Sequence, residues 1–136
     1  MYPDRILTKK DCERLQKVIE SRATKNVSEE QSLSIIKSYL TRVKPIDSKQ
    51  VRPDVVTMNS KVCLRNIGNG KKQIFSLVYP DDISQSKDRV SILSPLGSLV
   101  LGCCVGNVVK GFPYGEEYYL IENILYQPEA AGDYHL

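Results

Sequence analysis

The 136-residue sequence contains no tryptophan, two phenylalanines and a single histidine, His135. Without a second histidine the chain offers little for Ser-His or Cys-His catalysis. It has no run of 18 or more apolar residues, which excludes a transmembrane helix, and its first residues lack the apolar core and cleavage site of a signal peptide. We therefore expect a cytoplasmic protein that is not an enzyme.

Four cysteines, Cys12, Cys63, Cys103 and Cys104, are present, but none belongs to a C-x-x-C pair. A structural zinc site needs soft ligands paired a few residues apart, so we predict no metal and no cofactor. Adjacent cysteines such as Cys103 and Cys104 form a disulfide only with strain. We interpret the thiols as small hydrophobic side chains in the core of a protein from a reducing compartment.

Charge is distributed unevenly along a chain whose composition, 41% hydrophobic and 26% charged, is typical of a globular protein. Residues 1–52 hold 12 lysines and arginines against 7 acids, a net charge of +5, whereas residues 53–136 hold 7 against 9, a net charge of −2. A basic segment favours contact with an anionic surface or nucleic acid. A solvated helical face explains the same charge equally well.

A first helical pattern begins at Thr8. Thr8 and Asp11 resemble a capping box, and Cys12, Leu15 and Ile19 then recur at the spacing of one helix face. The pattern predicts an amphipathic helix that ends before a short polar link.

A second helical pattern follows this link, residues 21–27. Ser28 and Gln31 form a full capping box, and Pro45 ends the pattern. Its apolar positions repeat at helical spacing: Leu33, Ile36, Leu40 and Val43. Because a short connection places consecutive helices antiparallel, residues 8–44 are expected to form a helical hairpin with a coiled-coil-like seam and arms of roughly 20–24 Å.

Beyond the hairpin the pattern changes to strands. We expect an N-terminal hairpin domain over residues 1–46, a linker over residues 47–53 and a C-terminal domain over residues 54–136. Strand patterns cover residues 55–58, 61–66, 73–79, 89–93, 105–110 and 117–126. The last ten residues show no periodicity.

Residues that favour turns or helix ends lie between these predicted strands. Gly68-Asn69-Gly70 suits a hairpin turn. Ser94 followed by Pro95 suits the N-cap and first residue of a short helix, which Gly102 ends. The fold class is therefore α+β, with a short N-terminal antiparallel helical hairpin followed by an antiparallel sheet of five or six strands and one short helix.

The segment SPLGSLVLGCCVGNVV, residues 94–109, resembles the S-P-x-G-x-A-L-L-G-x-x-x-G-D-x-V signature in the C-terminal domain of the Gre transcript-cleavage factors. Residues 54–60 and 77–80 resemble the strands that precede that signature. The ending, residues 126–134, resembles a branch of the superfamily that has a much shortened coiled coil and is linked to regulation of nucleoside diphosphate kinase. The resemblance implies an FKBP-like domain, which is a curved antiparallel sheet with one short helix.

In Gre factors this domain docks at the rim of the secondary channel of bacterial RNA polymerase, against a helical hairpin of the β′ subunit. The resemblance places the contact on the strand-to-helix turn, whose residues here are Ser91, Ser94, Pro95, Leu96 and Gly97. It also implies that any effect on nucleoside diphosphate kinase is indirect, through transcription.

Gre factors carry acidic residues at the tip of their coiled coil, where they help to hold a second Mg²⁺ at the polymerase active site. The tip expected here has no carboxylate, and Arg22, Lys25 and Asn26 lie in it. Because Mg²⁺ prefers carboxylate oxygens and two cations would repel it, we expect a non-catalytic regulator. It would compete with Gre-type factors for polymerase without stimulating transcript cleavage.

Two other functions stay open. The basic hairpin suits a nucleic-acid-binding module that makes a weak RNA or DNA contact, whose affinity would fall steeply with salt. The FKBP-like fold suggests a prolyl isomerase, but fold alone is a poor guide to function. With two phenylalanines and no tryptophan, the chain has few side chains for an aromatic proline pocket.

Overall fold

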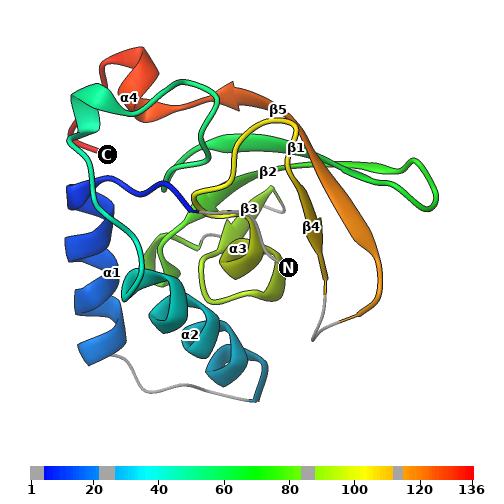
Figure 1. The fold of residues 1–136 in the computed structure, drawn as a ribbon, viewed down its shortest axis with the longest axis horizontal. Helices are drawn as coiled ribbons and strands as arrows, with labels where there is room; N and C mark the ends of the chain where they lie inside the picture. Colours follow the sequence, from blue (N-terminus) through cyan, green and yellow to red (C-terminus); the bar gives the residue numbers. More distant parts are fainter. Residues whose placement is uncertain (1–4, 22–26, 84–87, 112–114) are drawn as a thin grey trace.

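The computed structural model describes residues 5–21, 27–83, 88–111 and 115–136, without the side chains of Ser21 and Ser28. Within these residues, helices cover one side of a curved five-stranded sheet (Figure 1). The helices are α1 (Lys9–Ser21), α2 (Val27–Leu40), α3 (Pro95–Val100) and α4 (Pro128–Ala131), with 3₁₀ turns at Ser48–Gln50 and Pro80–Asp82. The strands are β1 (Lys61–Asn66), β2 (Lys72–Val78), β3 (Arg89–Ser91), β4 (Val108–Lys110) and β5 (Tyr118–Tyr126). None of the helices in this part of the chain is both long and apolar enough to span a membrane.

The strands lie in the order β3-β2-β1-β5-β4, so β1 is central. In β1, Cys63 lies opposite Ile74 of β2 and Asn123 of β5, and both pairings are antiparallel, as is that of β4 with β5. The expectation of a wholly antiparallel sheet was wrong, because β3 runs parallel to β2. Strand β3 begins with Arg89 beside Ser76 and ends with Ser91 beside Val78, so the connection after β2 brings the chain back toward the beginning of β2 before β3 starts.

The turn between β1 and β2 forms where Gly68-Asn69-Gly70 predicts it, with Gly70 at φ +73°. Residues 55–58, in contrast, do not form the expected strand. They are buried, but a single bridge joins Val55 to Cys104, and Val56 exchanges hydrogen bonds with the loop after α3 instead of with a strand edge. Residue types that are common in strands do not by themselves specify strand pairing.

The predicted ends of the two long helices are confirmed only in part. The Asp11 N–H donates to Thr8 Oγ1 at 3.1 Å, which confirms Thr8 as the N-cap of α1. The Asp11 carboxylate does not complete the capping box, because it accepts the N–H of Met58 instead. Helix α2 begins at Val27, one residue before the expected N-cap Ser28, and ends at Leu40.

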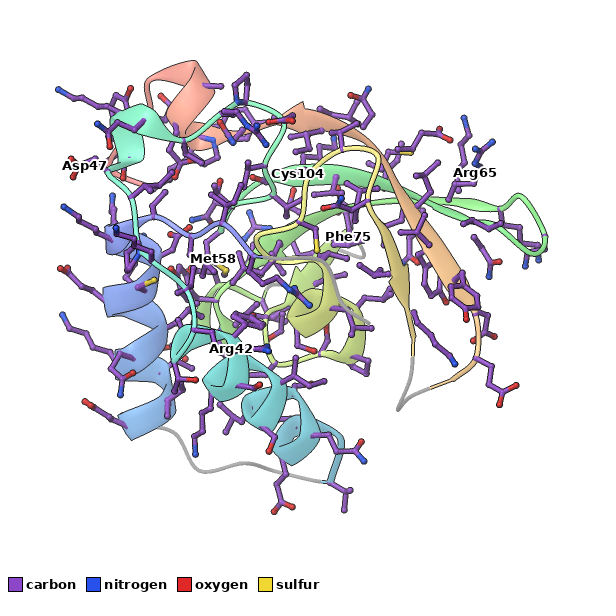
Figure 2. The ribbon with its side chains drawn as sticks, in the orientation of Figure 1. Arg42, Asp47, Met58, Arg65, Phe75 and Cys104 are labelled. Atoms are coloured by element: carbon purple, nitrogen blue, oxygen red, sulfur yellow. The ribbon has the colours of Figure 1, made fainter. Side chains whose placement is uncertain are left out.

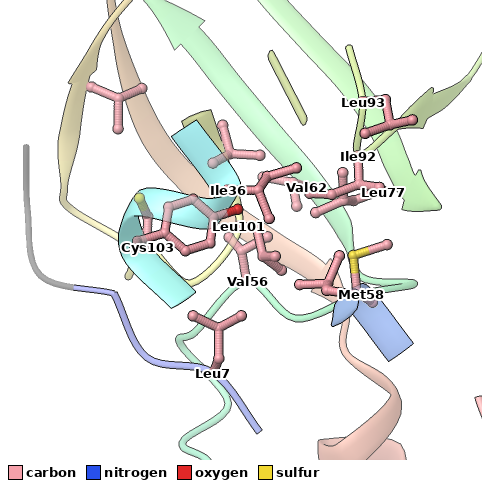
Figure 3. Packing of buried hydrophobic residues seen from close by; sticks show 14 of the residues in the cluster. Leu7, Ile36, Val56, Met58, Val62, Leu77, Ile92, Leu93, Leu101 and Cys103 are labelled. Atoms are coloured by element: carbon pink, nitrogen blue, oxygen red, sulfur yellow. The ribbon is translucent and has the colours of Figure 1, made fainter. Parts of the chain in front are cut away.

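The apolar stripes of α1 and α2 join the core of the sheet. Leu15, Ile36 and Phe75 are all 1% exposed and belong to one cluster (Figure 3 shows Ile36 among its neighbours). Helix α2 packs against α3, and the end of α1 stands apart from the beginning of α2 (Figure 1). The division of the chain at residues 47–53 stays a prediction.

The outer side of the sheet carries charged side chains. Figure 2 shows Arg65 on this side and Met58 and Phe75 in the interior. Arg65 and Lys72 both contact the Glu122 carboxylate, at 3.1 and 2.7 Å, and the hydrogen bond from Lys72 lowers the pKa of Glu122. Alternation of core-facing and outward-facing residues along β1 separates these two environments.

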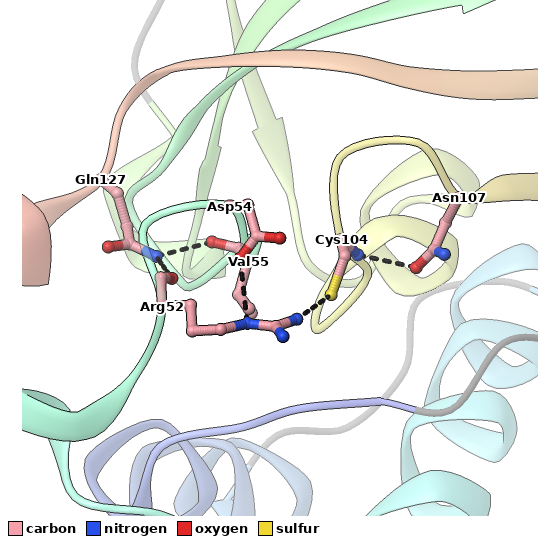
Figure 4. A network of polar contacts seen from close by, with 6 residues as sticks. All are labelled: Arg52, Asp54, Val55, Cys104, Asn107 and Gln127. Carbon is pink, nitrogen blue, oxygen red and sulfur yellow. Dashed lines mark hydrogen bonds and ion pairs between the residues drawn. The ribbon is translucent and has the colours of Figure 1, made fainter.

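Helix α4 was not predicted. The Gln127 side chain accepts the N–H of Ala130 at 3.1 Å, Pro128 occupies the first turn and Gly132 ends the helix at φ +80°. A capping side chain, an early proline and a terminal glycine are the signal that could have revealed it. The Gln127 amide also donates to the carbonyls of Arg52 and Val55, at 2.8 and 2.7 Å (Figure 4). These bonds join the C-terminal segment to the residues before β1.

Candidate functional site

The turn between β3 and α3 is closed by hydrogen bonds among its own residues. The Ser91 carbonyl accepts the Ser94 N–H at 2.9 Å and the Ser94 hydroxyl at 2.6 Å. Ser94 Oγ in turn accepts the Gly97 N–H at 3.2 Å, which confirms Ser94 as the N-cap of α3, with Pro95 at the first helical position. We call residues 91–97 the β3–α3 turn.

Gly97 lets α3 approach β3 closely. A Cβ atom at this position would lie 2.2 Å from the Ser91 carbonyl oxygen and 3.0 Å from Ile92 Cα. Both are backbone atoms, so no side-chain rotation could relieve the overlap. Glycine is therefore required by packing and not by its backbone angles.

The five site residues predicted from the sequence are brought together, but they are not equally accessible. Ser91, Ser94 and Pro95 are half-buried. Leu96 is half-buried too and packs against the core, and Gly97 is buried. A partner at this turn would therefore touch Ser91, Ser94, Pro95 and the edge of Leu96, while Gly97 would position them.

The other end of α3 is held by the N-terminal segment. The Arg5 guanidinium donates to the carbonyls of Leu101 and Ser98, at 2.7 and 3.4 Å, and lies 4.7 Å from the centre of the Tyr39 ring. Cations at a helix C-terminus stabilise the unpaired carbonyls there. Helix α3 is thus fixed at both ends, and the turn is a preformed surface.

The adjacent cysteines lie behind this turn. Cys103 is buried, its thiol donates to the Leu99 carbonyl at 3.4 Å, and burial raises its pKa. Cys104 is half-buried, Arg52 contacts its sulfur at 3.4 Å, and Asn107 Oδ1 accepts its N–H at 2.8 Å (Figure 4). All four cysteines are free thiols. The interpretation of the thiols as buried hydrophobic groups is correct for Cys63 and Cys103, whereas Cys12 and Cys104 are half-buried.

The predicted hairpin tip, with Arg22, Lys25 and Asn26, lies outside the described residues. On its N-terminal side Glu20 accepts a hydrogen bond from Gln16 at 3.1 Å. Across the parts of the chain that the structure describes, no three side chains of His, Cys, Asp or Glu come together in a way that could hold a metal ion.

Sequence reasoning missed a second group of polar residues, which we call the carboxylate junction: Asp11, Thr57, Met58, Tyr79 and Glu129. Asp11 is 2% exposed and accepts the Met58 N–H at 3.1 Å and the Tyr79 hydroxyl at 3.3 Å. Glu129 is 8% exposed and accepts the Thr57 hydroxyl at 2.7 Å. These partners lie 47 to 72 residues apart in the chain, so no local pattern could reveal them.

The structure thus places a pair of helices in front of a curved sheet, with a capped strand-to-helix turn at the sheet edge. Residues 50–126 match the family described as "Transcription elongation factor, GreA/GreB, C-term". The chain belongs to this family.

Relatives agree with this assignment. The "Regulator of nucleoside diphosphate kinase" of Escherichia coli (strain K12) is 34% identical, over 98% of this chain and 98% of its own length. The "Transcription elongation factor GreA" of Chlorobium phaeobacteroides (strain BS1) is 33% identical, over 81% of this chain and 79% of its own. Among solved structures, the "Prokaryotic transcription elongation factor GreA/GreB from Nitrosomonas europaea" superimposes with a TM-score of 0.74 at 29% identity, over 91% of this chain and 99% of that one. These likenesses confirm the α+β class and the Gre-type arrangement.

Proposed function

We propose that this chain is a non-catalytic transcription regulator that binds bacterial RNA polymerase at the rim of the secondary channel, in the cytoplasm. It competes there with Gre-type factors and does not stimulate transcript cleavage. Any change in nucleoside diphosphate kinase follows indirectly, through transcription.

The observation that carries the proposal is the preformed β3–α3 turn. Its backbone is closed by Ser94, and its accessible part presents Pro95 and the edge of Leu96. A surface whose side chains are already ordered loses little conformational entropy when a partner binds. The match of residues 50–126 to the GreA/GreB family supports the choice of polymerase as that partner.

The second part of the proposal, the absence of cleavage stimulation, rests on the hairpin. Helices α1 and α2 have 13 and 14 residues, and the sequence between them has no acidic residue. Arms of this size reach roughly 20 Å at 1.5 Å per residue. A short arm whose tip has no carboxylate is poorly suited to hold a second Mg²⁺ at the polymerase active site.

Binding can be tested by sedimentation of the purified protein with core RNA polymerase, with a GreA protein as competitor. We expect co-sedimentation that GreA displaces. A Pro95→Glu variant should bind roughly tenfold more weakly, because it places a charge in the contact, while glutamate is accepted in the first turn of a helix. The matched control is Leu125→Glu, which adds the same charge at an exposed position of β5.

Equal binding by the Pro95→Glu and Leu125→Glu variants would move the contact away from the β3–α3 turn. Failure of the wild-type protein to bind, or binding that GreA does not affect, would overturn the proposal. Affinity for free RNA or DNA that falls steeply with salt would favour the nucleic-acid-binding alternative.

Cleavage can be tested on stalled elongation complexes. The protein alone should leave transcript cleavage at its intrinsic rate, and added in excess it should slow cleavage that GreA stimulates. A direct effect on the kinase is tested by adding the protein to purified nucleoside diphosphate kinase, where we expect no change in activity. Stimulated cleavage, or a change in the purified kinase, would contradict the corresponding part of the proposal.

A further inference from the structure

The carboxylate junction joins three segments that are distant in the sequence. Asp11 belongs to α1, Thr57 and Met58 to the buried segment before β1, and Glu129 to α4. The Thr57 hydroxyl also lies 2.9 Å from Ser60 Oγ. Two carboxyl groups are thereby placed in the interior, where helix α1 meets the segment before β1 and helix α4.

Other charged groups of α1 point to the C-terminal tail. Lys10 donates to the Tyr134 carbonyl, and Arg14 donates to the His135 carbonyl at 3.3 Å. The Arg14 guanidinium lies 5.8 Å from the centre of the Tyr79 ring. Of these cations, Arg14 acts electrostatically on Asp11, and its effect is smaller than those of burial, the Met58 hydrogen bond and Glu129.

We propose that Asp11 attaches helix α1 to the segment before β1 in a proton-dependent way. Helix α1 is held more tightly when the Asp11 carboxyl group takes up a proton. A neutral carboxyl loses no charge hydration on burial and is not repelled by Glu129. Its proton has an acceptor nearby, because the Tyr79 hydroxyl oxygen at 3.3 Å can accept as well as donate. The Met58 N–H retains an acceptor in either state.

The direction of the effect follows from the electrostatics of the junction. Burial, followed by repulsion from Glu129, raises the pKa of Asp11 from 3.8 to about 6, against the opposing hydrogen bond from Met58. When α1 detaches, the carboxyl returns to water and to its ordinary pKa. The attached state therefore binds more protons between these two values, and its stability falls as the pH rises through about 6.

This attachment of α1 is separate from the proposed function and does not depend on polymerase. Helix α1 already packs on the core through Leu15, and the contacts of Asp11 add a second, polar attachment near the beginning of the helix. A change of pH would alter how firmly α1 is held at that end.

The Met58 amide is a direct reporter, since it donates to Asp11. In a ¹⁵N-resolved NMR titration of the full chain, we expect its chemical shift to change with a midpoint near pH 6 in the wild-type protein. In a Glu129→Gln variant, which keeps an acceptor for Thr57 but removes a charge, the midpoint should move down. A midpoint below 4.5 in the wild type, or one that Glu129→Gln leaves unmoved, would overturn the proposal.

Hydrogen exchange measures the attachment itself. After correction for intrinsic rates, the α1 amides should open roughly tenfold less at pH 5 than at pH 7.5 in the wild-type protein. An Asp11→Asn variant should lose this pH response. Glu13→Gln, at an exposed position of the same helix, and His135→Gln, because imidazoles as a class titrate near neutral pH, should both retain it.

Any one of three results would contradict the proposal: protection that does not change with pH in the wild type, a response that survives in Asp11→Asn, or a response that His135→Gln abolishes. If Asp11→Asn does not fold, the Glu129→Gln titration still decides the question, because that variant leaves Asp11 in place.

Discussion

The β3–α3 turn and the carboxylate junction border the same hydrophobic core but are held together in different ways. In the turn, the side-chain hydrogen bonds of Ser91 and Ser94 join residues two or three positions apart. In the junction, Asp11 and Glu129 receive hydrogen bonds from residues 47 to 72 positions away. The turn is a local structure placed on the core, whereas the junction exists only when distant segments have met.

Because of this difference, the two regions are destabilised by different kinds of substitution. A local turn depends on a few backbone-compatible residue types, so single substitutions that violate its geometry damage it. The junction depends on desolvated polar groups that satisfy each other, so removal of one partner leaves another buried without a hydrogen bond. The variants below separate these two kinds of dependence.

The largest effect is expected in the turn. Gly97→Ala places a Cβ 2.2 Å from the Ser91 carbonyl oxygen, so the backbone must move. We expect the free energy of unfolding in denaturant to fall by about 3 kcal/mol, the size of a severe overpacking change. Gly68→Ala is the control, because its Cβ would meet a side-chain atom of Asn66 at 3.3 Å in an exposed turn. Equal losses for the two variants would show that close packing does not explain the need for glycine at position 97.

Next in size is a change in the junction. Thr57→Val removes the hydroxyl that donates to the buried Glu129 carboxylate, and the unpaired charge should lower the free energy of unfolding by about 2 kcal/mol. Thr57→Ser, which keeps the hydroxyl, should retain most of the stability. Loss of stability in Thr57→Ser as large as in Thr57→Val would assign the effect to packing and not to the hydrogen bond.

A smaller loss is expected for the cap of α3. Ser94→Ala removes the acceptor for Gly97 N–H and the donor to Ser91, and should cost about 1 kcal/mol in chemical unfolding. Ser94→Thr keeps both groups and should be close to wild type. A stable Ser94→Ala variant that binds polymerase normally would mean that the cap matters to neither property.

The smallest effect, with the opposite sign, is expected in the core. The Tyr39 hydroxyl is buried and finds no hydrogen-bond partner in the described part of the chain. Tyr39→Phe should therefore leave the free energy of unfolding unchanged or raise it by up to about 1 kcal/mol, and the melting temperature should stay the same or rise accordingly. Tyr79→Phe, which removes the hydroxyl bonded to Asp11, should lower it. A melting temperature that falls equally in both variants would remove the distinction between a satisfied and an unsatisfied hydroxyl.

Particular elements show how far the sequence could lead. Ser94, Pro95 and Gly102 predicted helix α3 within one residue of its observed end, because capping chemistry is local. The same reasoning correctly predicted Thr8 as the N-cap of α1. It was wrong about Asp11, whose carboxylate accepts the Met58 N–H instead of completing the capping box. Residues 55–58 were wrongly predicted to be a strand, since residue types common in strands do not specify which backbone supplies the hydrogen bonds.

The sequence alone determined the α+β class, the β1–β2 hairpin, the preformed β3–α3 turn and the family, because each depends on residues close together or on a motif read along the chain. Tertiary structure alone decided that β3 runs parallel to β2, that the helical arms share the core of the sheet, and that Asp11 and Glu129 are both buried. The physical reason is the range of the interactions. Turns and caps are closed within a few residues, whereas strand direction and the desolvation of a carboxyl group are set by segments that become neighbours only when the chain has folded.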